Sequence, residues 1–177
     1  MLQIIGKGGM ALELAAYYDK TVKFAEYDEI QHLDPVQKTI IAIGSVQARK
    51  QIAEDFKFNY CTLNFGKIYG DHTIDEGSII CPGAKITTRV IIGKHNIINV
   101  NAAIHHDAII GDYVTISPGA IICGSVVIGD ECFIGAGAVI KDHINICNNV
   151  VIGAGAVVVK DITIPGVYVG NPCKFLK

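Results

Sequence analysis

The hydrophobic positions of this chain recur every six residues over most of its length. From Ile68 to Ile164, every sixth residue is isoleucine or valine, without an insertion. A second series, from Ser78 to Ile162, lies four residues after the first and holds mostly small or β-branched side chains. A period of six fits neither an amphipathic helix nor an alternating strand. It predicts a solenoid of short strands, in which three repeats make one coil of a three-sided prism.

The two series have different places in such a prism. The large aliphatic side chains point inward, each stacked on the one 18 residues further along the chain, and form a continuous core. The small residues fit beside them near the corners. Only 18% of the residues are charged, against roughly 25% in typical proteins, which agrees with several buried faces. Glycines recur at the turns between the strands: Gly77, Gly83, Gly93, Gly111, Gly119, Gly129, Gly137, Gly153 and Gly155.

The first 60 residues lack this period and alternate instead between apolar runs and helical segments. The alternation predicts a small parallel βαβ unit, about half of a Rossmann domain. We therefore divide the chain into a small α/β domain at 1–62 and a β-helix domain at 63–177. The predicted strands are Leu2–Ile5, Thr21–Ala25 and Thr39–Ile43, and the predicted helices are Met10–Tyr18 and Ala48–Phe56.

A glycine-rich turn follows the first predicted strand. Gly6, Gly8 and Ala11 match the pattern G-x-G-x-x-A, and Glu26 lies where a dinucleotide site places the acid that binds ribose. A full dinucleotide needs two mononucleotide-binding halves, and this segment has room for one. The pattern therefore favours a site for a single nucleotide moiety over an NAD site, with a purely structural turn as the remaining interpretation.

Charge and cysteine usage narrow the function classes. The net charge of −2 offers no basic excess for a phosphate backbone, so we expect no nucleic acid as a partner. The six cysteines form no CxxC pair and no zinc-type spacing, which favours free thiols in a reducing cytoplasm. Since the sequence contains no signal peptide and no long apolar run, we expect a soluble cytoplasmic protein without membrane insertion.

Three segments accompany the repeats: the head Gly6-Lys7-Gly8-Gly9, the central His106-Asp107-Ala108-Ile109-Ile110-Gly111-Asp112, and the tail Val169-Gly170-Asn171-Pro172-Cys173-Lys174. Together they resemble the sugar O-acyltransferase and nucleotide-amino-sugar N-acetyltransferase family over essentially the whole chain. The resemblance implies a mainly β protein, a left-handed parallel β-helix of hexapeptide repeats preceded by a small α/β half-Rossmann domain. It also implies acetyl-CoA as cosubstrate, no metal, a homotrimer, and as acceptor a nucleotide-linked amino sugar of the UDP-4-amino-deoxysugar type, used for bacterial surface glycans.

The resemblance also assigns roles to residues. His106 is the general base, Asp107 is its acidic neighbour, and the backbone N–H of Gly124 donates to the thioester oxygen. Imidazole suits this task because its ordinary pKa of about 6.5 lies close to neutral pH. The implied coenzyme A contacts are Thr115, Gly124, Ala136, Ala154 and Lys174. The implied contacts to the nucleotide sugar are Gly8, Gly9, Met10, Glu26, Tyr27 and Gly44.

The chain departs from the family pattern at several positions. Thr115 stands where the family often has a second histidine, and threonine cannot carry a proton in a two-histidine mechanism. Met10 replaces the histidine that often ends the glycine-rich head, which leaves the nucleotide and the sugar open. Cys173 replaces the usual alanine of the tail, a change between small residues. His105 is the rival base if the register slips by one residue.

Other functions share the repeat. An O-acetyltransferase of the sialic acid type would use the same residues with a different acceptor pocket. A non-catalytic trimeric β-helix scaffold would bind no coenzyme A. A zinc-dependent carbonic anhydrase of the β-helix type needs two histidines five residues apart, and none of the six histidines here has that spacing.

Overall fold

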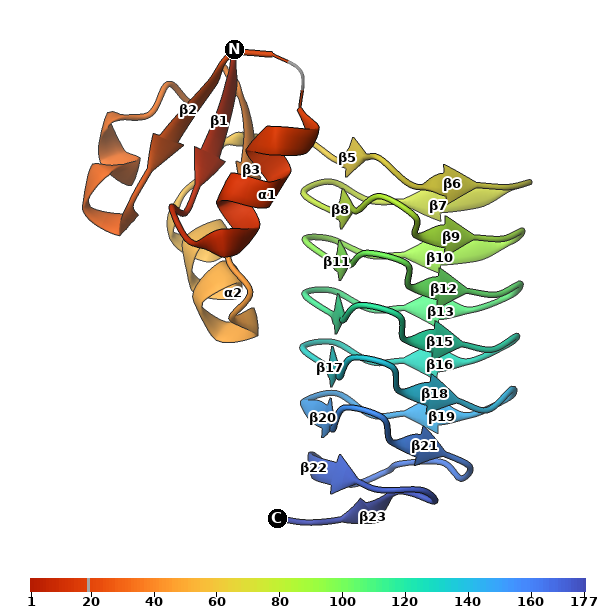
Figure 1. Cartoon of the computed structure of the whole chain (residues 1–177). Coiled ribbons are helices and arrows are strands. Elements are labelled where there is room, and N and C mark those ends of the chain that lie inside the picture. Colours follow the sequence, from red (N-terminus) through yellow and green to blue (C-terminus); the bar gives the residue numbers. More distant parts are fainter. Residues whose placement is uncertain (19) are drawn as a thin grey trace.

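A three-sided prism of parallel strands forms the larger part of the molecule (Figure 1). The computed structural model describes residues 1–18 and 20–177. Each prism strand pairs with the strand one coil later at a register of 18 residues, as Ile98 does with Ile116. The predicted parallel β-helix is therefore confirmed.

The strands form three faces, which we number I, II and III. Face I holds β5 (Leu63–Asn64), β8 (Ile79–Ile80), β11 (Ile97–Ile98), β14 (Thr115–Ile116), β17 (Phe133–Ile134), β20 (Val150–Ile152), β22 (Gly166–Val169) and β23 (Lys174–Phe175). Face II holds β6 (Lys67–Ile68), β9 (Lys85–Ile86), β12 (Ala103–Ile104), β15 (Ile121–Ile122), β18 (Val139–Ile140) and β21 (Val157–Val158). Face III holds β7 (His72–Ile74), β10 (Val90–Ile92), β13 (Ile109–Ile110), β16 (Val127–Ile128) and β19 (Asn145–Ile146).

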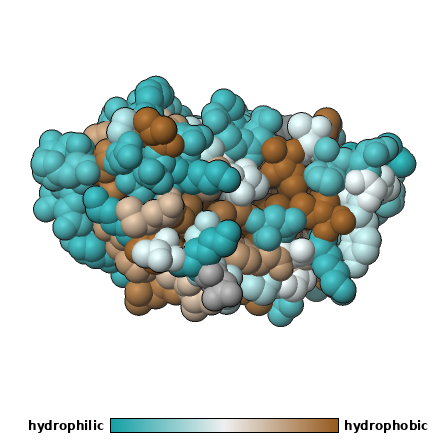
Figure 2. Space-filling view, turned by 90° about the horizontal axis from the view of Figure 1, so that it is seen from above, coloured by the Kyte–Doolittle hydropathy of each residue, from teal (hydrophilic) through white to brown (hydrophobic). Residues whose placement is uncertain are grey.

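Both six-residue series form the core, as predicted. The large aliphatic residues from Ile80 to Val158 are each no more than 2% exposed, and the small series from Ser78 to Ile162 is buried beside them. At the first coil, Ile68 and Ile74 are only partly buried, and the view from above shows hydrophobic surface among hydrophilic side chains (Figure 2).

The prediction is wrong for Ile164, which is 63% exposed and lies outside the strands. Ile162 forms a bridge with Ile146 instead, so the last coil is shorter than the others. Pro165 follows Ile164 and has no backbone N–H to continue a strand ladder.

The corners of the prism need left-handed backbone. Nine residues other than glycine have positive φ, and all of them lie in turns of the prism. Residues 18 apart stack at one corner, and between faces II and III this stack contains Arg89 (φ 56°), Asp107 (φ 62°), Ser125 (φ 58°) and His143 (φ 59°). The repeat thus brings side chains from successive coils side by side.

The N-terminal segment forms a four-stranded parallel sheet in the order β2-β1-β3-β4, so the predicted parallel α/β unit is confirmed. A 3₁₀ helix and the short fourth strand were not predicted, and the third strand ends two residues early, at Ile41. The elements are β1 (Leu2–Ile5), α1 (Gly9–Tyr17), β2 (Val22–Ala25), the 3₁₀ helix η1 (Tyr27–His32), β3 (Lys38–Ile41), α2 (Val46–Asp55) and β4 (Asn59–Tyr60).

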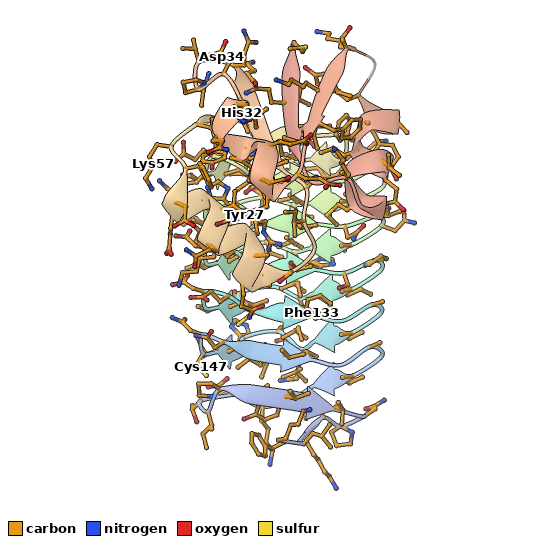
Figure 3. The ribbon with its side chains drawn as sticks, turned by 90° about the vertical axis from the view of Figure 1, so that its left-hand side faces the viewer. Tyr27, His32, Asp34, Lys57, Phe133 and Cys147 are labelled. Atoms are coloured by element: carbon orange, nitrogen blue, oxygen red, sulfur yellow. The ribbon has the colours of Figure 1, made fainter. Side chains whose placement is uncertain are left out.

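The α/β sheet and its helices cover the upper coils of face I, while Phe133 lies on this face below α2 (Figure 3). Ile79 and Ile97 of face I are buried in one core with Leu14 of α1. Arg49 of α2 is fully buried there and donates to the carbonyl oxygens of His95 (2.8 Å) and Tyr113 (2.9 Å). Among the described residues, no helix is long and apolar enough to cross a membrane.

Candidate active site

A histidine–aspartate pair lies at the corner between faces II and III. Nδ1 of His106 is 2.7 Å from Oδ2 of Asp107, and the histidine side chain is 57% exposed. An ionised carboxylate can only accept hydrogen bonds, so Nδ1 carries the proton and donates it to Asp107. Nε2 is then the unprotonated nitrogen. The pair can therefore accept a proton from a ligand at this corner.

Arg89 holds the other side of the Asp107 carboxylate. Its Nε and Nη2 donate to Oδ1 (2.6 Å) and Oδ2 (2.9 Å), a two-pronged contact across successive coils. The hydrogen bonds from Arg89 and then from His106 lower the pKa of the Asp107 carboxyl to about 2. Asp107 is therefore ionised over the whole range in which an imidazole titrates.

Gly124 lies directly beneath the His106 ring. A Cβ at this position would lie 2.6 Å from Cε1 and 2.7 Å from Nε2 of His106, so only glycine leaves room for the ring as it stands. The neighbouring Cys123 and Ser125 N–H groups donate to Ile140 and His106 carbonyls. Within the described part of the chain, the N–H of Gly124 has no such acceptor. It is available to a ligand oxygen beside the histidine.

A second hollow lies on the N-terminal domain, far from this corner in the fold. It has a volume of about 340 Å³ and lies at the carboxyl ends of β1, β2 and β3. Chain connections leave β1 towards β2 on one side and β3 on the other, and ligands bind at such a reversal of strand order in open α/β sheets. All six residues implied for the nucleotide sugar line it: Gly8, Gly9, Met10, Glu26, Tyr27 and Gly44.

Local structure explains the shape of this hollow. Gly6 has φ +118° and a Cβ there would lie 2.9 Å from the Ala42 carbonyl oxygen, so glycine is required at the turn after β1. Side chains added at Gly8, Gly9 or Gly44 would meet only open space. Lys7 forms an ion pair with Glu29 (3.0 Å) at the rim. The first N–H groups of α1 point into the hollow region, where helix N-termini favour anions.

The residues implied for coenzyme A lie apart from one another. Ala136 and Ala154 are exposed and stack one coil apart at the corner between faces I and II. Lys174 of β23 lines a separate hollow of about 280 Å³ at the C-terminal end of the prism, with Tyr168 and Phe175. Only Gly124 lies with the His106 corner.

Thr115 is placed differently from the expected cofactor contact. It is 3% exposed on face I, beneath α2, and its hydroxyl accepts a hydrogen bond from Nη2 of Arg49 (2.9 Å). Because this side chain already has a partner inside the protein, the proposal below does not rely on it. His105, the rival base, is exposed, and no side-chain hydrogen bond of it is found among the described residues.

Two residues of the site region were not predicted from the sequence. Arg89 lies 18 residues before Asp107, and the register of the coils alone would have placed it there. Arg49 lies in a helix outside the repeat, and its contacts to His95 and Tyr113 are 46 and 64 residues away. No spacing rule connects such positions.

The prism, its repeat and the histidine corner define a transferase of the left-handed β-helix class. The family model of the bacterial transferase hexapeptide (six repeats) matches residues 107–142 and 125–160. A comparison with curated proteins found no match.

Solved structures similar to this chain extend the match over nearly its whole length. The acetyltransferase domain of PglB from Neisseria gonorrhoeae FA1090, in complex with acetyl coenzyme A, is 30% identical, with 99% of this chain and 98% of that chain covered and a TM-score of 0.89. WeeI from Acinetobacter baumannii AYE is 27% identical (99% and 99% covered, TM-score 0.88). PerB from Caulobacter crescentus, in complex with CoA and GDP-perosamine, is 25% identical (99% and 97% covered, TM-score 0.89). The chain therefore belongs to the hexapeptide-repeat acetyltransferases.

Proposed function

We propose that this protein transfers the acetyl group of acetyl-CoA to the amino group of a nucleotide-linked amino sugar. The observation that carries the proposal is the His106–Asp107 pair, whose free Nε2 lies above the unpaired N–H of Gly124. The comparison structures that hold acetyl coenzyme A, or CoA with GDP-perosamine, support both substrates. A UDP-linked 4-amino-deoxysugar for bacterial surface glycans is the first acceptor to test.

The chemistry follows from these groups. The amine nitrogen of the sugar attacks the carbonyl carbon of the thioester, and Nε2 of His106 takes the amine proton. The N–H of Gly124 stabilises the negative charge that develops on the carbonyl oxygen. The C–S bond then breaks, and the thiolate of coenzyme A leaves with the proton from His106. The products are an amide and free coenzyme A, and no covalent acyl-enzyme forms.

The nucleotide part of the acceptor is proposed to bind in the hollow at the end of β1, β2 and β3. The free N–H groups at the start of α1 suit its phosphates, and Glu26 suits a ribose hydroxyl. Coenzyme A is proposed to lie along the prism past Ala136 and Ala154, with Lys174 at its far end, where a basic side chain suits a phosphate.

A complete site requires more than one copy of the chain. The nucleotide hollow belongs to the domain on face I, whereas His106 lies at the corner between faces II and III, on the opposite side of the prism (Figure 1). We therefore include in the proposal a homotrimer in which one protomer supplies the hollow and its neighbour supplies His106. Exposed aliphatic residues on all three faces support burial in an assembly: Ile91 (48%), Ile109 (43%), Ile121 (38%), Phe133 (36%) and Val151 (37%).

An assay of thiol release tests the function. Purified protein is incubated with acetyl-CoA and UDP-, dTDP- or GDP-linked amino sugars, and with a sialic acid as a hydroxyl acceptor. We expect turnover with an amino sugar and a loss of about 10²-fold or more in His106→Ala. His105→Ala is the matched control and should keep its activity. Turnover with sialic acid alone would replace the proposal by O-acetylation, and no turnover with no coenzyme A binding would leave a scaffold.

A further inference from the structure

The Asp107 carboxylate is shared between two side chains from different coils. Its Oδ2 accepts from Nδ1 of His106 (2.7 Å) and also from Nη2 of Arg89 (2.9 Å), while Oδ1 accepts from Nε of Arg89 (2.6 Å). Arg89 and Asp107 occupy equivalent corner positions, both with left-handed backbone, so the register of the prism sets their separation. The guanidinium fork matches both carboxylate oxygens and fixes their plane.

We propose that Arg89 is a positioning residue for the acetyl transfer: it holds the Asp107 carboxylate against Nδ1 of His106 and balances its negative charge. The inference rests on the proposed function, since it assigns a role beside that function's base. Arg89 touches Asp107 and acts on the reacting atoms only through it.

The charge balance gives this arrangement a consequence for pH dependence. A carboxylate alone beside an imidazole favours the protonated ring, and a protonated ring cannot take the proton of the attacking amine. A cation on the far side of the carboxylate reduces that effect. Asp107 remains ionised because its pKa is lowered to about 2, first by the hydrogen bond from Arg89. It therefore orients the ring without holding it in the charged form.

The other groups around this corner do not supply the same charge. Asp71, one coil before Arg89, is acidic, and its carbonyl oxygen accepts from the Arg89 backbone N–H. Ser125, one coil after Asp107, is uncharged, and Cys123 precedes Gly124 with its thiol pKa raised by burial. Lys141, Asp142 and His143 lie in the next coil, where Asp142 is the nearest partner of both neighbours. Arg89 is thus the cation in direct contact with the pair.

The test compares two variants that separate charge from shape. Arg89→Gln removes the charge, and Arg89→Lys keeps the charge but loses the fork. For Arg89→Gln we expect the acid-side midpoint of the kcat profile to move up by about half a pH unit and the plateau to fall several-fold, with KM values nearly unchanged. For Arg89→Lys we expect the midpoint of the wild type and a lowered plateau.

The matched control is Lys94→Gln. It removes the cation of another exposed corner ion pair, Lys94–Glu76 (3.0 Å), whose partners are also 18 residues apart. This variant should keep the wild-type profile, and in an Asp107→Asn background Arg89→Gln should cause no further shift. Equal plateau losses in Gln and Lys variants with an unmoved midpoint would overturn the charge role, as would a wild-type profile in Arg89→Gln.

A second readout does not depend on catalysis. The ring signal of His106, assigned with His106→Ala, is followed by NMR against pH in the resting protein. We expect its midpoint to be higher in Arg89→Gln than in the wild type and unchanged in Lys94→Gln. An identical midpoint in Arg89→Gln overturns the inference. Absence of acetyl transfer by the wild type would instead overturn the proposed function, and the NMR comparison would still decide the role of Arg89.

Discussion

Gly124 is the residue whose role depends most closely on a single contact. Alanine would keep the backbone N–H, but its Cβ would lie 2.6 Å from Cε1 of His106 and displace the ring. The ring is exposed and can turn outward, so we expect little loss of stability. Because a misplacement of about 1 Å of a reacting group costs about 10²-fold in rate, we expect Gly124→Ala to lower kcat by about 10- to 100-fold.

Steady-state kinetics and thermal unfolding of Gly124→Ala check this. In a His106→Ala background the same substitution should have no further effect, because the ring it displaces is absent. A wild-type kcat in Gly124→Ala would mean that the His106 ring is not the group beside which the reaction occurs.

At this scale the sequence supplied the residue types but not their partners. The His106–Asp107 pair follows from adjacency, and its 2.7 Å contact was foreseeable. The Arg89 contact was within reach of the same register argument. The bond between Arg49 and Thr115 was not, because it joins a helix to a prism strand 66 residues away.

At the scale of elements, His95 marks the contact between the N-terminal domain and the prism. Its ring stacks on Tyr113 (5.3 Å between centroids) and meets the edge of Tyr60 (4.7 Å). Its Nδ1 has no hydrogen-bond partner among the described residues. Burial lowers the pKa of His95 to about 4, and the nearby Glu76, Arg49, Lys94 and Asp112 modify this effect. Neutral histidine therefore fits the junction and charged histidine does not.

This gives a stability prediction with a defined direction. Since the pKa of His95 is lowered by folding, the unfolded chain takes up the proton first as the pH falls. The contribution of neutral His95 is complete above about pH 6.5 and decreases from there to about pH 4, by as much as about 3 kcal/mol of unfolding free energy. Denaturant unfolding across this range should show that His95→Phe flattens the pH dependence.

His143→Phe is the control for this experiment. His143 also has left-handed backbone (φ 59°), but its side chain is 74% exposed. Its replacement should leave the pH dependence as in the wild type. An equally steep dependence in His95→Phe would place the titrating group elsewhere. The prism strands were predictable because one local period sets them all. This junction was not, since it joins aromatic side chains from β4 and from two corner turns of the prism.

At the scale of the whole molecule, the separation of the nucleotide hollow from His106 predicts complementation between inactive subunits. Gly44→Glu would place a charged side chain in the hollow without a clash inside the protein, since a Cβ at Gly44 meets only open space. His106→Ala removes the base and leaves the hollow intact. Homotrimers of either variant should be inactive, and light scattering should give a trimer in both cases.

Co-expression of the two variants with different tags, followed by purification on both tags, yields only mixed trimers. If one protomer supplies the hollow and its neighbour supplies His106, each mixed trimer has one intact site out of three. We expect about one third of the wild-type activity, whichever variant is present twice. If hollow and base belong to the same protomer, every protomer carries a defect and the mixed trimers remain inactive. The sequence repeat predicts a prism but does not state which corner meets which neighbour, because the same register serves all three corners.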